Sequence, residues 1–230
     1  MGLIESEAFV LNGFRYGESS KIITLYSSAF GKFNAIVKGV RNVKARHSGV
    51  YENMNLINVF FNKKDNRTLQ LISKADLICS YRQVKSELDK LAVAYNMLEI
   101  LNKTSIEYDT SVNAFVLLKN VFDYLEKSKT NYGFVLLYYI YKLSFVQGLD
   151  FLSYVSNGTF TKDSTYKISV KHNELLEIFR EKDICELDCE MIGKPDLKYL
   201  NKVLLEFYAL NFQKFNFLKT NNFLNEILNM

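Results

Sequence analysis

The fold is decided by residues 7–38, which read EAFVLNGFRYGESSKIITLYSSAFGKFNAIVK. Short runs rich in β-branched and aromatic residues follow one another in this stretch, and Gly17 and Gly31 stand between them at positions that suit turns. Two runs of the same character come later in the chain. The predicted strands are 7–14, 21–26, 32–38, 54–61 and 68–80. Five short strands in about eighty residues predict a small barrel.

The last of these strands has one mainly apolar face and one mixed face. Leu69, Leu71, Ser73, Ala75 and Leu77 alternate with Gln70, Ile72, Lys74, Asp76 and Ile78. Because one face of a closed or half-open sheet is buried, we expect the first set to line the interior.

The apolar spacing changes to three and four residues from Val84 onward, which indicates amphipathic helices. Ser86 and Asp89 form a plausible N-terminal capping pair for the first helix. The segment 134–145 is apolar on all sides, so we expect a helix buried inside a helical domain. The predicted helices are 84–101, 112–125, 134–145, 173–180, 196–212 and 222–228. The fold class is therefore α+β, with a barrel domain at 1–81 and a helical domain at 82–230.

Positive charge is concentrated in the barrel. No acidic residue lies between Glu18 and Glu52, whereas six cationic residues do, and subtracting these six charges from the chain's net charge of +4 leaves −2 for the rest. A local excess of this kind indicates a local anionic partner. With Arg15 just before it, the predicted nucleic-acid-binding set is Arg15, Lys21, Lys32, Lys38, Arg41, Lys44 and Arg46.

Aromatic residues are interleaved with these cations. They are Phe14, Tyr16, Tyr26, Phe30, Phe33 and Tyr51. Small barrels bind nucleic acid with cationic side chains on the phosphates and aromatic rings under the bases, although most rings in such a domain fill its core. An acidic protein and an anionic lipid surface remain as alternative partners for the same charges.

Signatures of catalysis are absent from the sequence. It contains no G-x-S-x-G, H-E-x-x-H, Walker A or G-x-G-x-x-G pattern, and its two histidines are His47 and His172. Cys185 and Cys189 form a pair that lacks partners for a four-ligand metal site, and with Cys79 they make an odd number of cysteines. We therefore expect a non-enzyme without cofactor or metal in the reducing cytoplasm, with neither a membrane span nor a secretion signal.

An ordered series of motifs in the first half of the chain resembles the RecO family of bacterial DNA repair and recombination mediators. The matching residues are Glu7-Ala-Phe-Val-Leu, Tyr16-Gly-Glu-Ser-Ser-Lys-Ile22, Thr24-Leu25, Phe30-Gly-Lys32, Val37-Lys-Gly-Val-Arg41 and Ser48. The similarity continues more weakly through 88–101, 138–148 and 217–220. Many members of the family carry a four-cysteine zinc module after the long buried helix, but residues 148–171 contain no cysteine, so we predict no zinc here.

The resemblance implies an OB-fold at the N-terminus, binding of single- and double-stranded DNA, strand annealing, and work at the nucleoid. It also implies that RecR and the single-strand-binding protein are partners, with RecA loaded indirectly. A tail site for the single-strand-binding protein is expected among Phe and Lys residues of 134–147 and 198–219. The competing interpretation is a protein-interaction adaptor whose basic barrel face meets an acidic protein instead of DNA.

Overall fold

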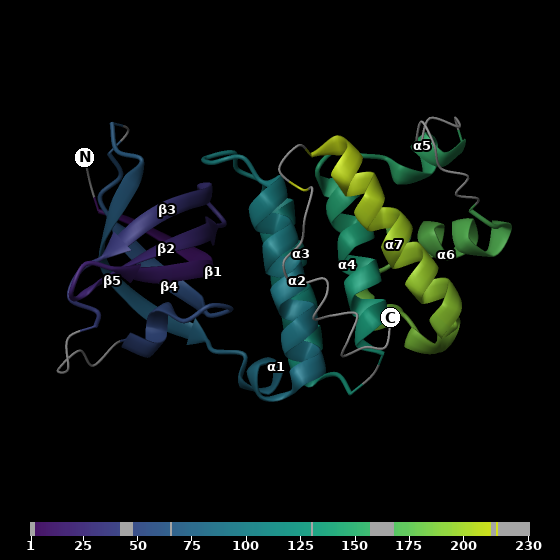
Figure 1. The fold of residues 1–230 in the computed structure, drawn as a ribbon, viewed down its shortest axis with the longest axis horizontal. Helices are drawn as coiled ribbons and strands as arrows, with labels where there is room; N and C mark the ends of the chain where they lie inside the picture. Colours follow the sequence, from purple (N-terminus) through teal and green to yellow (C-terminus); the bar gives the residue numbers. More distant parts are fainter. Residues whose placement is uncertain are drawn as a thin grey trace. The chain divides into compact units, whose positions relative to one another are not determined.

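The computed structural model describes residues 3–41, 48–64, 66–129, 131–156, 168–212 and 215. The chain forms two compact units, and it passes from one unit to the other more than once. Residues Met1–Arg82 and Ser105–Val116 form the barrel unit, and Gln83–Thr104 and Leu117–Met230 form the helical unit. Figure 1 shows the strands of the first unit and the helices of the second.

The barrel unit is built on a closed sheet of five strands in the order β1-β2-β3-β5-β4. Its strands are β1 Ile4–Tyr16, β2 Ser20–Ser27, β3 Gly31–Val37, β4 Leu56–Phe61 and β5 Leu69–Cys79, with a 3-10 turn, η1, at Ser48–Tyr51. All neighbouring strands are antiparallel except β3 and β5, which run parallel. The predicted five-stranded barrel is thus confirmed, with β1 longer at both ends than its sequence pattern indicated.

Alternate residues of the strands fill the barrel. Ile23 and Leu25 of β2 and Phe33 and Ala35 of β3 are fully buried, and Phe33 stacks on Phe61 with ring centroids 5.1 Å apart. Residues that alternate with them, such as Ile22 and Ile36, belong to the outer face and are only partly buried. The period of two in the sequence therefore reports correctly which side of β2 and β3 faces the core.

The predicted faces of β5 are wrong in the first part of the strand. Gln70 and Ile72 are buried and Leu71 is exposed, whereas Ala75 is buried as predicted and Leu77 is exposed. The pairing of β4 with β5 shifts register between Phe60 and Phe61, which adds a residue to β5 between Ile72 and Lys74, so the inward side changes from even-numbered to odd-numbered residues there. Simple alternation along the sequence cannot anticipate such a bulge.

The segment Ser105–Val116 completes the barrel unit after one helix of the other unit. The amide of Tyr108 donates to the carbonyl of Lys32 at 2.8 Å, and Gln70 Nε2 donates to the Tyr108 hydroxyl at 3.0 Å. The ring of Phe115 lies 5.8 Å from that of Phe9. Main-chain, side-chain and aromatic contacts thus all attach this segment to the strands.

The helical unit follows the chain in sequence order. Its elements are α1 Arg82–Ser86, α2 Leu88–Thr104, α3 Val112–Lys127, α4 Tyr132–Val146, α5 Phe151–Ser156, α6 Val170–Glu181, η2 Ile184–Glu186, η3 Cys189–Met191 and α7 Lys194–Asn211, with α1 and α3 beginning in the barrel unit. Among the described helices, none is both long and apolar enough to cross a membrane.

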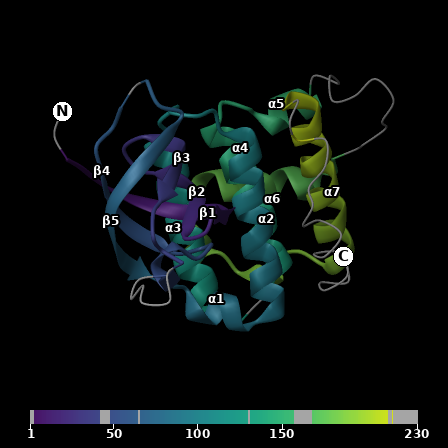
Figure 2. The same ribbon diagram turned by 60° about the vertical axis from the view of Figure 1, so that its left-hand side comes forward.

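Helix α4 forms the centre of this unit, as predicted from its apolar sequence. It lies among α2, α6 and α7, which Figures 1 and 2 show around it. Asn131 caps its N-terminus by accepting from the amide of Phe134, and the buried hydroxyl of Tyr208 donates to the carbonyl of Ile140 at 3.0 Å. The helix is buried from Gly133 through Tyr141, so it serves as core instead of surface.

Two helices differ from the expectation. The predicted helix 84–101 is broken at Glu87 into α1 and α2, and Ser86 ends α1 instead of capping α2. At the break, Glu87 pairs with Lys90 at 3.0 Å, and this ion pair and hydrogen bond lower the pKa of Glu87. Helix α5 lies where no helix was predicted, and the predicted helix 222–228 lies outside the described residues.

Candidate nucleic-acid interface

Four of the seven predicted contact residues lie at one end of the barrel, around the β1–β2 turn. Arg15 pairs with Lys21 across β1 and β2, and Lys21 pairs with Val37 across β2 and β3, so Lys38 comes directly after the same row. Arg15 and Lys38 are exposed. This register, and not proximity in the sequence, brings the cations of three strands together.

Arg41 joins this group through hydrogen bonds to the turn itself. Its amide donates to the carbonyl of Ser19 at 2.9 Å, and its Nη1 donates to the carbonyl of Gly17 at 3.0 Å. Gly17 has φ of +57°, a conformation that glycine adopts without strain. The chain leaving β3 is therefore tied to the β1–β2 turn, and the Arg41 side chain is held exposed beside Arg15 and Lys38. We call Arg15, Lys38 and Arg41 the cationic rim.

Lys21 has a different role from the rim. Its side chain is half-buried, and its ammonium group donates to the carbonyl of Tyr51 in η1. Burial, followed by the charge of Asp76, raises the pKa of Tyr51, so its phenol is a neutral part of the core. Lys21 therefore connects β2 to η1 and contributes positive charge close to the rim.

Lys32 does not belong to this end of the barrel. It lies at the start of β3, whereas Lys38 follows the end of that strand, and it pairs with Tyr26 and bridges to Glu107. The register therefore places Lys32 away from the other predicted contacts. Lys44 and Arg46, with His47, lie outside the described residues.

Two of the six candidate aromatic rings are available on the surface. Phe14 is 57% exposed and Tyr16 is 52% exposed. Tyr26, Phe33 and Tyr51 are buried in the barrel, and Phe30 packs partly buried against its core. Only Phe14 and Tyr16, of these six, can therefore offer a free ring face, and both are on the strand that carries Arg15.

Phe14 begins an apolar row across the outer face of the sheet. In register it pairs with Ile22, Ile22 pairs with Ile36, and Ile36 pairs with Leu71. Phe14 and Leu71 are exposed and the two isoleucines are partly buried. An outward row of this kind, beside a cationic rim, offers flat apolar surface for bases and charge for phosphates.

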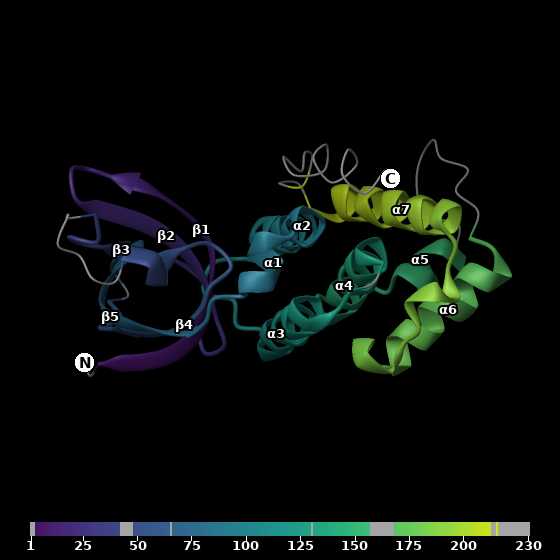
Figure 3. The same ribbon diagram turned by 90° about the horizontal axis from the view of Figure 1, so that it is seen from below.

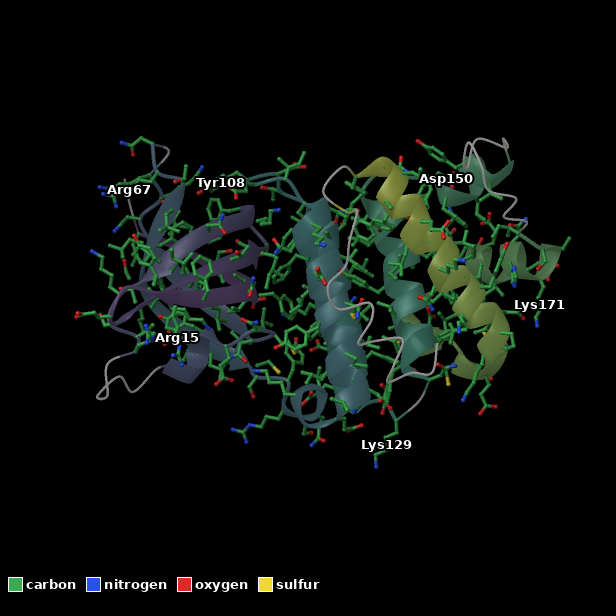
Figure 4. All side chains as sticks on the ribbon, in the orientation of Figure 1. Arg15, Arg67, Tyr108, Lys129, Asp150 and Lys171 are labelled. Atoms are coloured by element: carbon green, nitrogen blue, oxygen red, sulfur yellow. The ribbon has the colours of Figure 1, made fainter. Side chains whose placement is uncertain are left out.

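A second group of cations was missed from the sequence. Lys63, Lys64 and Arg67 lie in the β4–β5 loop, and the Lys63 ammonium is 5.5 Å from the centre of the Tyr108 ring. Gln70 holds this loop through hydrogen bonds to the carbonyls of Lys64 at 3.0 Å and Arg67 at 2.9 Å. Figure 4 shows Arg67 and Tyr108 at the opposite end of the barrel from Arg15. The three cations within residues 62–67 were the signal that could have revealed this group.

Side chains for metal chemistry are not assembled in the part of the chain that the structure describes. There, no three His, Cys, Asp or Glu residues are grouped as metal ligands would be. Cys79, Cys185 and Cys189 are free thiols.

The barrel matches a known protein family. A family model described as "Recombination protein O N terminal" matches residues 1–81. The DNA repair protein RecO of Chloroherpeton thalassium is 31% identical over 156 residues, which cover 67% of this chain and 60% of the relative. The chain belongs to the RecO family.

Two further RecO relatives match a similar part. The protein of Pelodictyon phaeoclathratiforme is 30% identical over 65% of this chain, and that of Chlorobium limicola is 28% identical over 64%. The matches span 56% and 57% of the length of these two relatives. Within the RecO-family barrel, the resembling motif 16–22 forms the β1–β2 turn, and the motif 37–41 brings Lys38 and Arg41 to it.

Proposed function

We propose that this chain is a non-catalytic mediator of DNA repair and homologous recombination that binds single- and double-stranded DNA through its OB-fold barrel. In this proposal it promotes strand annealing at the nucleoid in the cytoplasm. With RecR it helps to load RecA onto DNA that is coated by the single-strand-binding protein. The observation that supports DNA binding best is the combination of the exposed Phe14 and Tyr16 with the cationic rim on one end of the barrel.

The two elements of this surface suit different parts of a nucleic acid. Rim cations attract phosphates without regard to base sequence. Exposed rings stack on bases. A single strand has bases available for this stacking, whereas the bases of a duplex are already stacked on one another. The proposed site should therefore bind both forms of DNA, with the aromatic residues favouring the single strand.

Replacing Phe14 by alanine is expected to weaken binding to a single-stranded oligonucleotide about tenfold, within the range measured for the loss of one stacking ring. Binding to duplex DNA should change much less. Fluorescence anisotropy with labelled single- and double-stranded oligonucleotides measures both. A matched control is Leu77→Ala, which removes an exposed apolar side chain from β5. If the wild-type chain binds no DNA in this assay, the adaptor interpretation replaces the proposal.

The helical unit supports a proposed contact with the acidic, apolar tail of the single-strand-binding protein. Phe145 is 44% exposed at the end of α4, and the Arg180 guanidinium carbon lies 4.7 Å from its ring centre. Lys142 Nζ donates to the carbonyl of Arg180 at 3.0 Å. An exposed ring beside two cations complements a peptide that carries both carboxylates and apolar residues. Part of the expected range 198–219 lies outside the described residues.

The substitution Phe145→Ala is expected to weaken binding of a labelled tail peptide about tenfold, because it removes an exposed aromatic anchor. Val170→Ala serves as the control, since Val170 is an exposed apolar residue of α6 away from this ring. Anisotropy titration of the full chain with the peptide measures the effect. Equal affinities of the two variants and the wild type would exclude Phe145 from the tail site.

A further inference from the structure

A cavity of about 590 Å³ lies in the helical unit between α3, α4 and the segment that begins η2. Helices α3 and α4 are labelled in Figure 3. The apolar wall of the cavity includes Leu117 and Val121 of α3 and Ile184 of η2. Tyr124 and Tyr138 add two aromatic rings. The volume is in the range of ligand-binding pockets, and none of these residues belongs to the proposed DNA surface or to the group of Phe145, Lys142 and Arg180.

The charged side chains of this cavity are mainly acidic. Asp123 and Asp183 line it together with one cation, Lys127. Asp183 is fixed by η2, because its amide donates to Glu186 Oε2 at 2.9 Å in a reciprocal capping arrangement. A carboxylate held in place at the edge of an apolar cavity attracts a cationic group more strongly than one that moves freely in water.

Tyr138 reports the same sign of charge. Its hydroxyl donates to the carbonyl of Lys182 at 3.1 Å, which fixes the ring in the cavity wall. Burial raises the pKa of Tyr138, and the negative charges of Asp183 and Glu186 add to this rise. The aromatic wall is therefore neutral, and its surroundings disfavour a further negative charge.

We propose that this cavity binds a protein segment that carries an arginine beside an apolar residue. The guanidinium would pair with Asp123 and Asp183 and lie against a tyrosine ring, and the apolar neighbour would pack on Leu117, Val121 and Ile184. The chemistry is opposite to that of an acidic tail, so the cavity takes a different partner from the one proposed for Phe145. This inference goes beyond the proposed function and does not depend on DNA binding.

Cys185 provides a direct measure of occupancy, because it is exposed and lines the same cavity. The full chain is treated with N-ethylmaleimide in the presence of acetyl-Leu-Arg-Leu-amide or of acetyl-Leu-Glu-Leu-amide, and alkylation of each cysteine is followed by mass spectrometry. We expect the arginine peptide to slow alkylation of Cys185 several-fold at saturation. Cys79 in the barrel unit should react at an unchanged rate, and the glutamate peptide should protect neither thiol.

The variant Asp123→Asn tests the charge with little change of shape. It should weaken protection by the arginine peptide about tenfold, since a charge-assisted hydrogen bond is lost. Lys127→Gln, one turn further along α3, is the matched control and should retain or strengthen protection. Both variants should melt as the wild type does and bind DNA normally. Equal protection by both peptides, protection by neither, or an unchanged Asp123→Asn variant would overturn the proposal.

Discussion

Replacing Arg15, Lys38 and Arg41 together by glutamine is expected to weaken binding of single-stranded DNA about a hundredfold at 0.1 M salt. Each phosphate contact on a single strand contributes about 0.7 to the slope of log affinity against log salt concentration, so three contacts contribute about two. A slope of two corresponds to about two decades of affinity at 0.1 M. The loss should be the same for every base sequence, because phosphate contacts carry no sequence information.

The measurement is a series of anisotropy titrations at several salt concentrations, for the variant and the wild type. The matched control removes the same charge from three exposed lysines of the helical unit, Lys129, Lys182 and Lys194. It separates the local field of the rim from the effect of net charge. A wild-type affinity that does not change with salt, or an equal loss in the control, would contradict the electrostatic role of the rim. Thermal melting checks that losing the Arg41 bond to Gly17 leaves the barrel folded.

The second large effect is expected from Gly31→Ala, which should lower the free energy of unfolding of the barrel unit by about 2–4 kcal/mol. Gly31 has φ of +62°, where an L-residue is strained. A methyl group at this position would also overlap the carbonyl oxygen of Asp109, which is main chain and cannot rotate away. The segment 105–116 would have to move off the start of β3 to admit it.

Gly17→Ala is the matched control for this prediction. Gly17 has nearly the same dihedral angle, φ of +57°, but an added methyl group would meet no atom within 4 Å. Its substitution should therefore show only the backbone strain, about 1–2 kcal/mol. Urea unfolding followed by circular dichroism compares the two variants. Equal losses of stability would mean that the close approach of Asp109 to Gly31 contributes nothing.

The barrel could be predicted from the sequence because its signals are local. Ile23, Leu25, Phe33 and Ala35 alternate with outward residues, and glycines mark the turns, so periodicity alone identifies β2 and β3. The buried helix α4 was equally clear from its composition. The faces of β5 were not predictable along its whole length, because a register shift between Phe60 and Phe61 exchanges inside and outside without a sequence signature, and a second shift lies between Leu56 and Ile57.

The candidate site was predicted only in part, because its geometry depends on pairing between strands. Lys32 and Lys38 are six residues apart in the sequence, yet the register puts only Lys38 with Arg15. The acid-free stretch suggested one continuous surface, whereas the barrel divides its described cations between two ends. Arg67 lies outside the acid-free stretch, in a loop that also contains an acid, although the structure brings it to the end that Lys32 occupies. Which rings stay exposed is also a tertiary property, as Phe14 and Phe33 show.

The return of the segment Ser105–Val116 to the strands affects the order in which the protein can fold during synthesis. All five strands have been made once Cys79 leaves the ribosome, but Tyr108 and Phe115, which cover Lys32, Gln70 and Phe9, have not. At common translation rates the missing segment arrives roughly 2–7 s later. During this time part of the aromatic surface of the nascent barrel is uncovered. Helix α2 must be translated before the segment Ser105–Val116 can pack on the strands. Synthesis of the two units is interleaved, although each has its own core.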